Sequence, residues 1–201
     1  MGNKKITSVI FLCLALIASF VAGKSFLSMH TPDIIVKGPG VTEQKMLSDY
    51  FSKLKGSNGD TEIYIFEGEN PGASMLILGG THANEPSGYM SAISLIERAK
   101  VEFGTLYVIP RANNSAFTHN DPQEGSPQNF TIKTEHGDRV FRYSSRATNP
   151  IDQWPDPDVY VHAASGQQLS GSETRNLNRA YPGREEGTFT EQVTYGITQL
   201  I

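Results

Sequence analysis

Residues 75–86 read M-L-I-L-G-G-T-H-A-N-E-P, and this stretch decides the fold. Its first four residues are all apolar, which is typical of a strand that is buried on both faces. Two glycines then permit a sharp turn, and Pro86 stands where a first helical residue needs no N–H. Beyond it, apolar residues recur at helical spacing: Tyr89, Ala92, Ile93, Ile96 and Ala99. The sequence therefore predicts a strand, a turn and a helix over residues 75–100.

His82 and Glu85 lie in the turn, at the carboxyl end of the predicted strand, where open α/β sheets bind their ligands. An imidazole and a carboxylate at this spacing can reach one point, and Zn²⁺ accepts both types of ligand. A catalytic zinc needs a third protein ligand and an open position. The same pair also fits a turn histidine beside a glutamate at a helix N-terminus, where negative charge is favoured. The pattern alone leaves both interpretations open.

The rest of the chain predicts an α/β fold, with a mixed, largely parallel sheet flanked by helices. Residues 104–110 form the next buried strand, so that a right-handed crossover makes a parallel βαβ unit. We expect further strands at residues 33–36 and 61–66, and a turn at residues 69–72 that leads into the central strand. Between them, apolar spacing over residues 41–55 predicts an amphipathic helix with Thr42 as its cap.

Residues 113–172 form a polar, proline-broken segment, which we expect to be an insertion at the rim of the active-site cleft. Short elements at residues 140–143 and 159–162 would order it. Just before it, Arg111 leaves its strand at the same sheet edge as His82, where it either binds an anion or pairs locally.

Residues 1–23 have the pattern of a secretory signal peptide: two lysines, a charge-free apolar run over residues 6–22, and small residues before Lys24. The alternative is an uncleaved membrane anchor, because the run is just long enough to span a bilayer. We therefore expect an exported protein, with membrane contact only if the segment is retained. Residues 24–201 contain no cysteine, so no disulfide is expected there.

Composition excludes few classes of protein. The chain has 201 residues and a formal net charge of −4, which gives no reason to expect a nucleic-acid partner. A local arginine can still bind an anionic small molecule against this net charge.

Two motifs together resemble the succinylglutamate desuccinylase/aspartoacylase family, within the zinc carboxypeptidase group. The first is G-G-T-H-A-N-E-P-S-G at residues 79–88. The second is R-N-L-N-R-A-Y-P-G at residues 175–183, with a Gly-Thr pair shortly after it. The resemblance runs roughly from residue 61 to the C-terminus. It implies a zinc carboxypeptidase-like fold for a partial catalytic domain over residues 24–201.

The resemblance implies a zinc hydrolase that cleaves an amide or ester bond next to a carboxylate, in N-acyl amino acids or short peptides. His82 and Glu85 match the first two zinc ligands. Asn178 and Arg179 match the pair that holds the substrate carboxylate. Arg175 is the candidate for the arginine that stabilises the oxyanion, although the family's equivalent usually lies a few residues further upstream.

The sequence also departs from the family pattern. The family's third zinc ligand, a histidine, and its general-base glutamate both come later than the second motif, and neither is identifiable here. We therefore expect the front part of such an enzyme, truncated at its C-terminus and with little or no activity. Four other histidines could complete the site, but we expect each to be a solvated loop residue: His30, His119, His136 and His162. Of these, His162 is the best candidate for a third ligand. A non-catalytic carboxylate-binding module and an inactive, poorly folded fragment remain alternatives.

Overall fold

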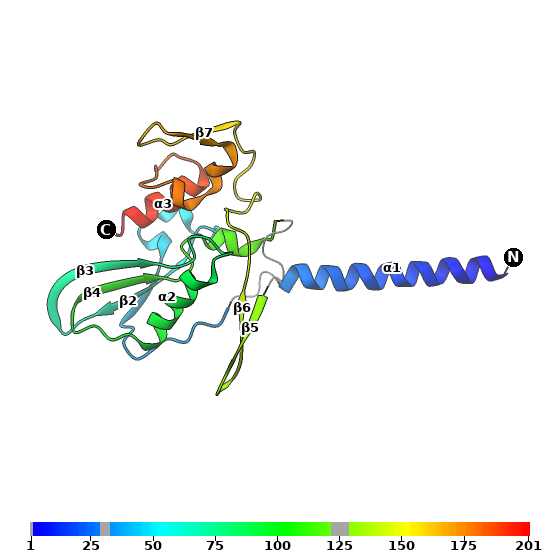
Figure 1. Ribbon diagram of the computed structural model, residues 1–201, viewed down its shortest axis with the longest axis horizontal. Coiled ribbons are helices and arrows are strands. Elements are labelled where there is room, and N and C mark those ends of the chain that lie inside the picture. Colours follow the sequence, from blue (N-terminus) through cyan, green and yellow to red (C-terminus); the bar gives the residue numbers. More distant parts are fainter. Residues whose placement is uncertain (1, 29–32, 122–128) are drawn as a thin grey trace. The chain divides into compact units, whose positions relative to one another are not determined.

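The computed structural model describes residues 2–28, 33–121 and 129–201. Its internal contacts divide the chain into two compact units, Met1–Pro32 and Asp33–Ile201. The helices and strands of both units are labelled in Figure 1.

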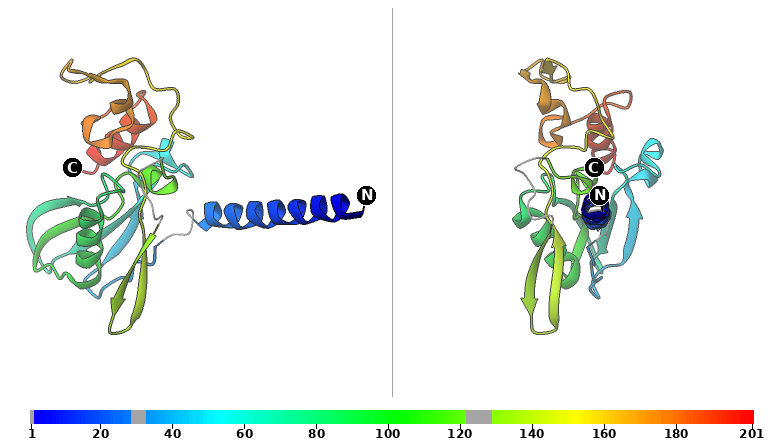
Figure 2. Two further views of the ribbon diagram at one scale, coloured as in Figure 1. Left: turned by 45° about the vertical axis from the view of Figure 1, so that its right-hand side comes forward. Right: turned by 90° about the vertical axis from the view of Figure 1, so that its right-hand side faces the viewer.

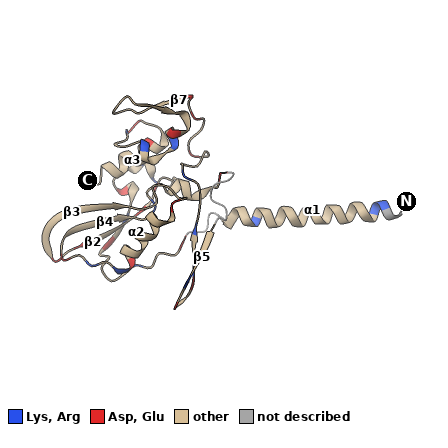
Figure 3. Cartoon of the chain, in the orientation of Figure 1, with Lys and Arg blue, Asp and Glu red and all other residues tan. Residues whose placement is uncertain are grey.

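The first unit consists of one helix, α1, from Gly2 to Ser28. Figure 3 shows basic residues only toward its two ends. The stretch Lys4–Ser28 is long and apolar enough to cross a membrane, a property that secretory signal sequences near an N-terminus share. Cleavage after Gly23 stays a prediction.

The second unit is built on a four-stranded mixed sheet in the order β1-β2-β4-β3. These strands are β1 (Glu43–Met46), β2 (Glu62–Glu67), β4 (Phe103–Ile109) and β3 (Asn70–Leu78). The prediction of a mixed sheet is confirmed. The prediction that it is largely parallel is wrong for this sheet, because only β3 and β4 pair in parallel while the other two pairings are antiparallel.

The predicted strand, turn and helix are present. Helix α2 runs from Pro86 to Arg98, with the proline in its first turn, and it connects β3 to β4 as the expected parallel crossover (Figure 1). Gly80 has a φ of +60°, which a residue with a side chain rarely adopts. The predicted buried face of the helix is confirmed for the four residues within it: Tyr89, Ala92, Ile93 and Ile96.

Helix α2 covers one face of the sheet (Figure 2), and α3 (Phe189–Thr198) contributes Val193 and Ile197 to the core on the other side. Successive residues of a strand point to opposite faces, so Tyr64 and Phe66 pack with α2 while Ile63 and Ile65 face the other way. The core on that second side also contains Leu47, Phe51, Leu54, Ile109, Leu177, Val193 and Ile197.

The predicted helix over residues 41–55 is wrong. The segment instead holds β1 and two short 3₁₀ helices, Leu47–Asp49 and Ser52–Leu54. The Thr42 hydroxyl does not cap a helix; it donates to the Ile65 carbonyl at 3.0 Å and so extends the pairing with β2. The two 3₁₀ turns bury apolar residues at nearly the spacing of an α-helix, which explains the error.

Three smaller expectations also fail. Residues 33–36 form no strand: the Asp33 carboxylate accepts a bond from the Arg142 amide at 2.9 Å and pairs with Arg111 at 3.3 Å, so side chains hold this segment. The expected turn at residues 69–72 lies largely inside β3, which begins at Asn70. The strand is not buried on both faces, because β3 is at the edge of the described sheet and Met75 is 63% exposed.

The segment at residues 113–172 has structure of its own. It contains a 3₁₀ helix (Asn114–Thr118), the projecting hairpin β5–β6 (Asn129–Thr134 and Gly137–Arg142), and a second hairpin, β7–β8 (Val159–Val161 and Gln168–Ser170) (Figure 2). Both expected short elements are therefore present as strands. Phe117 and Phe141 pack with Tyr89 of α2, so the segment also supplies part of the core.

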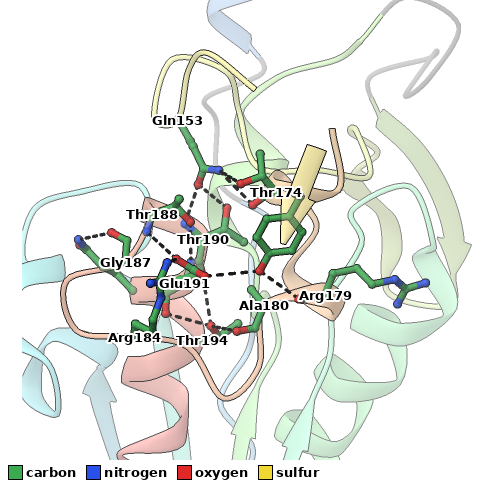
Figure 4. A network of polar contacts seen from close by, with 12 residues as sticks. Gln153, Thr174, Arg179, Ala180, Arg184, Gly187, Thr188, Thr190, Glu191 and Thr194 are labelled. Carbon is green, nitrogen blue, oxygen red and sulfur yellow. Dashed lines mark hydrogen bonds and ion pairs between the residues drawn. The ribbon is translucent and has the colours of Figure 1, made fainter. Parts of the chain in front are cut away.

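Two more 3₁₀ helices, Gly171–Arg175 and Leu177–Arg179, carry the second sequence motif to the start of α3. Figure 4 shows the polar network that fixes this start. Thr188 and Glu191 form a capping box, in which the Thr188 amide donates to the Glu191 carboxylate at 2.9 Å. Arg184 donates to the same carboxylate at 2.8 Å. Glu191 is buried, and the network ties α3 to the motif that precedes it.

Glu191→Gln is expected to lower the free energy of unfolding by about 1–2 kcal/mol near neutral pH, because its charge-assisted hydrogen bonds are lost. The loss is limited because Arg184, one of the two donors, is half exposed. Burial raises the pKa of the Glu191 carboxyl, but the bonds from Arg184 and Thr188 outweigh it and lower this pKa below its ordinary value. A carboxylate with a lowered folded-state pKa stabilises fully above its unfolded pKa, and the contribution disappears as the pH falls through the folded-state pKa.

The variant and the wild type should therefore converge in acid. Urea unfolding at neutral pH and at a series of progressively lower pH values measures this difference. Glu186→Gln is the matched control, since the Glu186 side chain is 84% exposed and its replacement should have little effect. An equal loss in both variants, or a gap that persists in acid, contradicts the account.

Candidate metal and carboxylate site

The turn after β3 places His82 in the interior of the second unit. The strand ends at Leu78, and His82 is buried with 6% of its surface exposed. The Glu85 amide donates to the His82 carbonyl at 3.2 Å, which closes the turn. Glu85 then stands directly before α2, where the positive end of the helix dipole favours its carboxylate. The His82 ring is therefore held in place while the Glu85 side chain, 57% exposed, stays open to solvent.

Asn176 of the second motif fixes the orientation of the His82 ring. The His82 Nε2 atom lies 2.9 Å from the Asn176 Oδ1 atom. The same Oδ1 atom accepts from the Asn178 amide at 3.1 Å, while Asn176 Nδ2 donates to Glu173 at 2.7 Å. The Asn176 oxygen is thereby an acceptor, so Nε2 of His82 carries the hydrogen. Two motifs 94 residues apart are joined by this bond.

The other ring nitrogen, Nδ1, faces Glu85. It lies 3.0 Å from the Glu85 Oε1 atom. Two such acceptor atoms at this distance require a positive group between or beside them, either a proton on Nδ1 or a cation. The donor pair of an imidazole nitrogen and a carboxylate oxygen is one that Zn²⁺ accepts. The geometry fits two of the three protein ligands of a catalytic zinc.

Arg146 also reaches this pair of atoms. Its Nη1 atom lies 3.0 Å from Glu85 Oε1 and 3.3 Å from His82 Nδ1. The loop that carries Arg146 is held beside the turn, because the Ser144 amide donates to the Ala83 carbonyl at 3.4 Å. Arg146 lies in the polar segment outside both motifs, and no local sequence pattern distinguishes it from other arginines.

The predicted carboxylate-binding pair lies next to this network. Arg179 is half exposed, and its Nε atom lies 3.5 Å from Glu173 Oε2, the same oxygen that accepts from Asn176. Asn178 is exposed, and its backbone amide is the group that joins the network. Hydrogen bonds and one ion pair thus run from His82 through Asn176 and Glu173 to Arg179. A carboxylate-binding role for the Asn178 and Arg179 side chains stays a prediction.

Arg175 lies in a different environment. It is buried, and its Nε and Nη2 atoms hold the two oxygens of Asp156 at 2.8 and 3.0 Å. Its Nη1 atom donates to the Thr148 carbonyl at 2.9 Å. All three nitrogens are thus used in packing the motif against the 148–156 loop, an arrangement that favours a structural role. The oxyanion role of Arg175 stays a prediction.

A third ligand is not found where the sequence allowed one. Among the described residues, no group of three or more His, Cys, Asp or Glu side chains could hold a metal. The His162 ring lies 2.8 Å from the Tyr181 carbonyl and 2.6 Å from the Ser165 hydroxyl, and it lines a hollow of about 130 Å³ with Arg184. Burial lowers the pKa of His119, and the nearby Asp121 partly offsets this effect. His30 lies outside the described residues.

No protein-family model and no curated protein matches the sequence. An aspartoacylase family protein from Mesorhizobium loti matches in structure, with 21% identity, over 71% of this chain and 31% of that chain, at a TM-score of 0.42. An ectoine utilization protein from Ruegeria pomeroyi, solved with product bound, has 23% identity over 68% of this chain and 28% of that chain, at a TM-score of 0.40.

A succinylglutamate desuccinylase from a Silicibacter species has 19% identity over the same shares of the two chains, 68% and 28%, at a TM-score of 0.39. This chain therefore spans 28–31% of the length of these three structures. The activities in their names are those of the longer proteins. The solved structures that this chain is similar to thus include an aspartoacylase family protein and a succinylglutamate desuccinylase.

Proposed function

We propose that this chain carries two zinc ligands, His82 and Glu85, and the carboxylate-binding residues of a metal-dependent hydrolase. The bond between His82 Nε2 and Asn176 Oδ1 carries the proposal. It joins the two motifs and turns Nδ1 toward the Glu85 carboxylate. A partner that fixes the second nitrogen of a ligating histidine is a regular feature of metal sites.

The substrate class follows from the second motif. Arg179 offers a planar fork that binds a carboxylate through two parallel bonds, and the Asn178 amide can donate to the same group. Glu173 pairs with Arg179 at 3.5 Å and is 30% exposed, so an incoming carboxylate can replace it. We propose that the substrate is a small molecule with a carboxylate next to the scissile amide or ester, such as an N-acyl amino acid or a short peptide.

His82 and Glu85 would hold the zinc, which would supply Lewis-acid chemistry for breaking the amide or ester bond. Arg179 and Asn178 hold the substrate by its carboxylate, so that the bond to be broken meets the metal in a fixed position. The third ligand and the general base are not assigned to residues of this chain.

Zinc titration of the purified full chain, held in mild detergent because of α1, tests the proposal. The wild type is expected to bind zinc, and His82→Ala should lose at least about a hundredfold in affinity, because one of two ligands and the fixed partner of Asn176 are removed. His162→Ala is the matched control and should bind as the wild type does. Equal binding by all three proteins overturns the proposed ligand.

A second function has one observation in its favour. Because the described residues offer no third ligand, a carboxylate-binding module without metal is also consistent with the site. A carboxylate-binding module would bind an N-acyl amino acid in the presence of a chelator and after His82→Ala, and it would lose this binding in Arg179→Ala. A metal-dependent site instead loses hydrolysis or zinc in His82→Ala.

We also propose that α1 directs export, either as a cleaved signal peptide or as an anchor. Its length, apolar composition and basic start support this proposal. Cell fractionation followed by intact mass measurement tests it. An exported protein shortened by about the first 23 residues fits cleavage, full length in the membrane fits an anchor, and full-length protein free in the cytoplasm refutes both.

A further inference from the structure

The guanidinium of Arg146 lies at the position where the proposed site needs a cation. Its Nη1 atom, His82 Nδ1 and Glu85 Oε1 form a triangle with sides of 3.0, 3.0 and 3.3 Å. One nitrogen of the guanidinium thus contacts both of the proposed ligand atoms at once.

The Nδ1 atom of His82 can accept a hydrogen bond from Arg146 or bind a metal ion, but it cannot do both at once. With the hydrogen on Nε2, Nδ1 has a single lone pair in the plane of the ring. An N–H group of Arg146 that donates to Nδ1 uses the same lone pair that would bind a metal. The guanidinium charge would also repel a divalent cation placed a few ångströms away.

The His82 and Arg146 sides of this contact differ in their exposure to solvent. The His82 side chain is 5% exposed and is fixed by Asn176 from behind. The Arg146 side chain is 38% exposed and comes from a loop beyond the end of β6. The guanidinium therefore approaches from the solvent side of the site, whereas the His82 ring is fixed in the interior.

We propose that Arg146 occupies the cation position of the His82–Glu85 site in the metal-free protein and must withdraw before zinc binds. The inference rests on the proposed metal site and adds a residue that sets its affinity. Without metal, the Arg146 guanidinium neutralises the Glu85 carboxylate that faces His82 Nδ1. The same guanidinium then competes with zinc for these two atoms. Arg146 is a residue that regulates access to the site, and it is not assigned a part in bond cleavage.

The test compares zinc dissociation constants, measured by chelator competition, for the full chain in detergent. Arg146→Ala is expected to bind zinc about tenfold more tightly than the wild type, because the competing donor and its charge are removed. Arg146→Gln keeps the stem of the side chain without the charge and should also bind more tightly. Lys100→Ala, which removes an exposed positive charge just beyond the far end of α2, is the charge control and should match the wild type.

The outcomes separate this inference from the proposed function. Tighter binding by both Arg146 variants, lost again when His82→Ala is added, supports both. Equal or weaker binding in folded Arg146 variants, with zinc still lost in His82→Ala, overturns the role of Arg146 and leaves the metal site standing. An absence of zinc binding in every protein, Arg146→Ala included, overturns the metal site itself. Thermal unfolding of each variant shows whether it is folded.

Discussion

Replacing Asn176 by leucine is expected to weaken zinc binding by about 10- to 100-fold and to lower the free energy of unfolding by about 2–3 kcal/mol. Asn176 is buried at 2% exposure and holds the His82 ring through Nε2. Leucine leaves the buried His82 N–H without an acceptor, and it also removes the bonds that Asn176 makes to the Asn178 amide and to Glu173. The ring then loses the contact that directs Nδ1 toward Glu85.

Zinc titration and urea unfolding of the same protein measure the two effects. Asn176→Asp separates them: it keeps an acceptor for His82, and therefore zinc binding, but places a second carboxylate near Glu173 and should still destabilise. Asn129→Leu, at an exposed position of β5, is the control for the substitution itself. Wild-type zinc affinity in a folded Asn176→Leu protein would show that the bond between the motifs does not position the ligand.

Replacing Arg175 by methionine is expected to lower the free energy of unfolding by about 3 kcal/mol, because it leaves the mostly buried Asp156 carboxylate unpaired. Zinc affinity should stay within about twofold of the wild type, since the Arg175 nitrogens contact Asp156 and Thr148. Adding Asp156→Leu to Arg175→Met should restore much of the loss, as removal of both charges often does.

Arg98→Met, at the exposed end of α2, is the matched control and should cost less than about 0.5 kcal/mol. This experiment also decides between the two roles considered for Arg175. A variant that stays as stable as the wild type but loses hydrolysis of an N-acyl amino acid would restore the oxyanion role. A large loss of stability that the double variant recovers identifies a structural ion pair.

The elements that the sequence predicted well are those that short segments determine. A wholly apolar run, two glycines and a proline specify β3, the turn and α2 without help from the rest of the chain. The positions of His82 and Glu85 follow from these same residues. The failures have non-local causes: β1 exists because it pairs with β2, and the antiparallel direction of β2 against β4 depends on pairing between distant segments.

The site shows the same division. His82, Glu85, Asn178 and Arg179 are visible in two short motifs, and the structure connects the motifs through Asn176. Arg146 could not be found from the sequence, because only the packing of its loop against the turn brings it to Glu85. Arg175 lies inside a motif, yet its contacts with Asp156 are set by a loop about twenty residues away and are invisible in the local pattern.

Nitrogen-15 NMR of histidine-labelled protein, with and without zinc, tests the central claim most directly. The account predicts that His82 carries its hydrogen on Nε2 before zinc is added, and that zinc then changes the Nδ1 resonance while Nε2 stays protonated. His82→Ala assigns the signals. Zinc-dependent changes at another histidine alone, or coordination of His82 through Nε2, would contradict the proposed site.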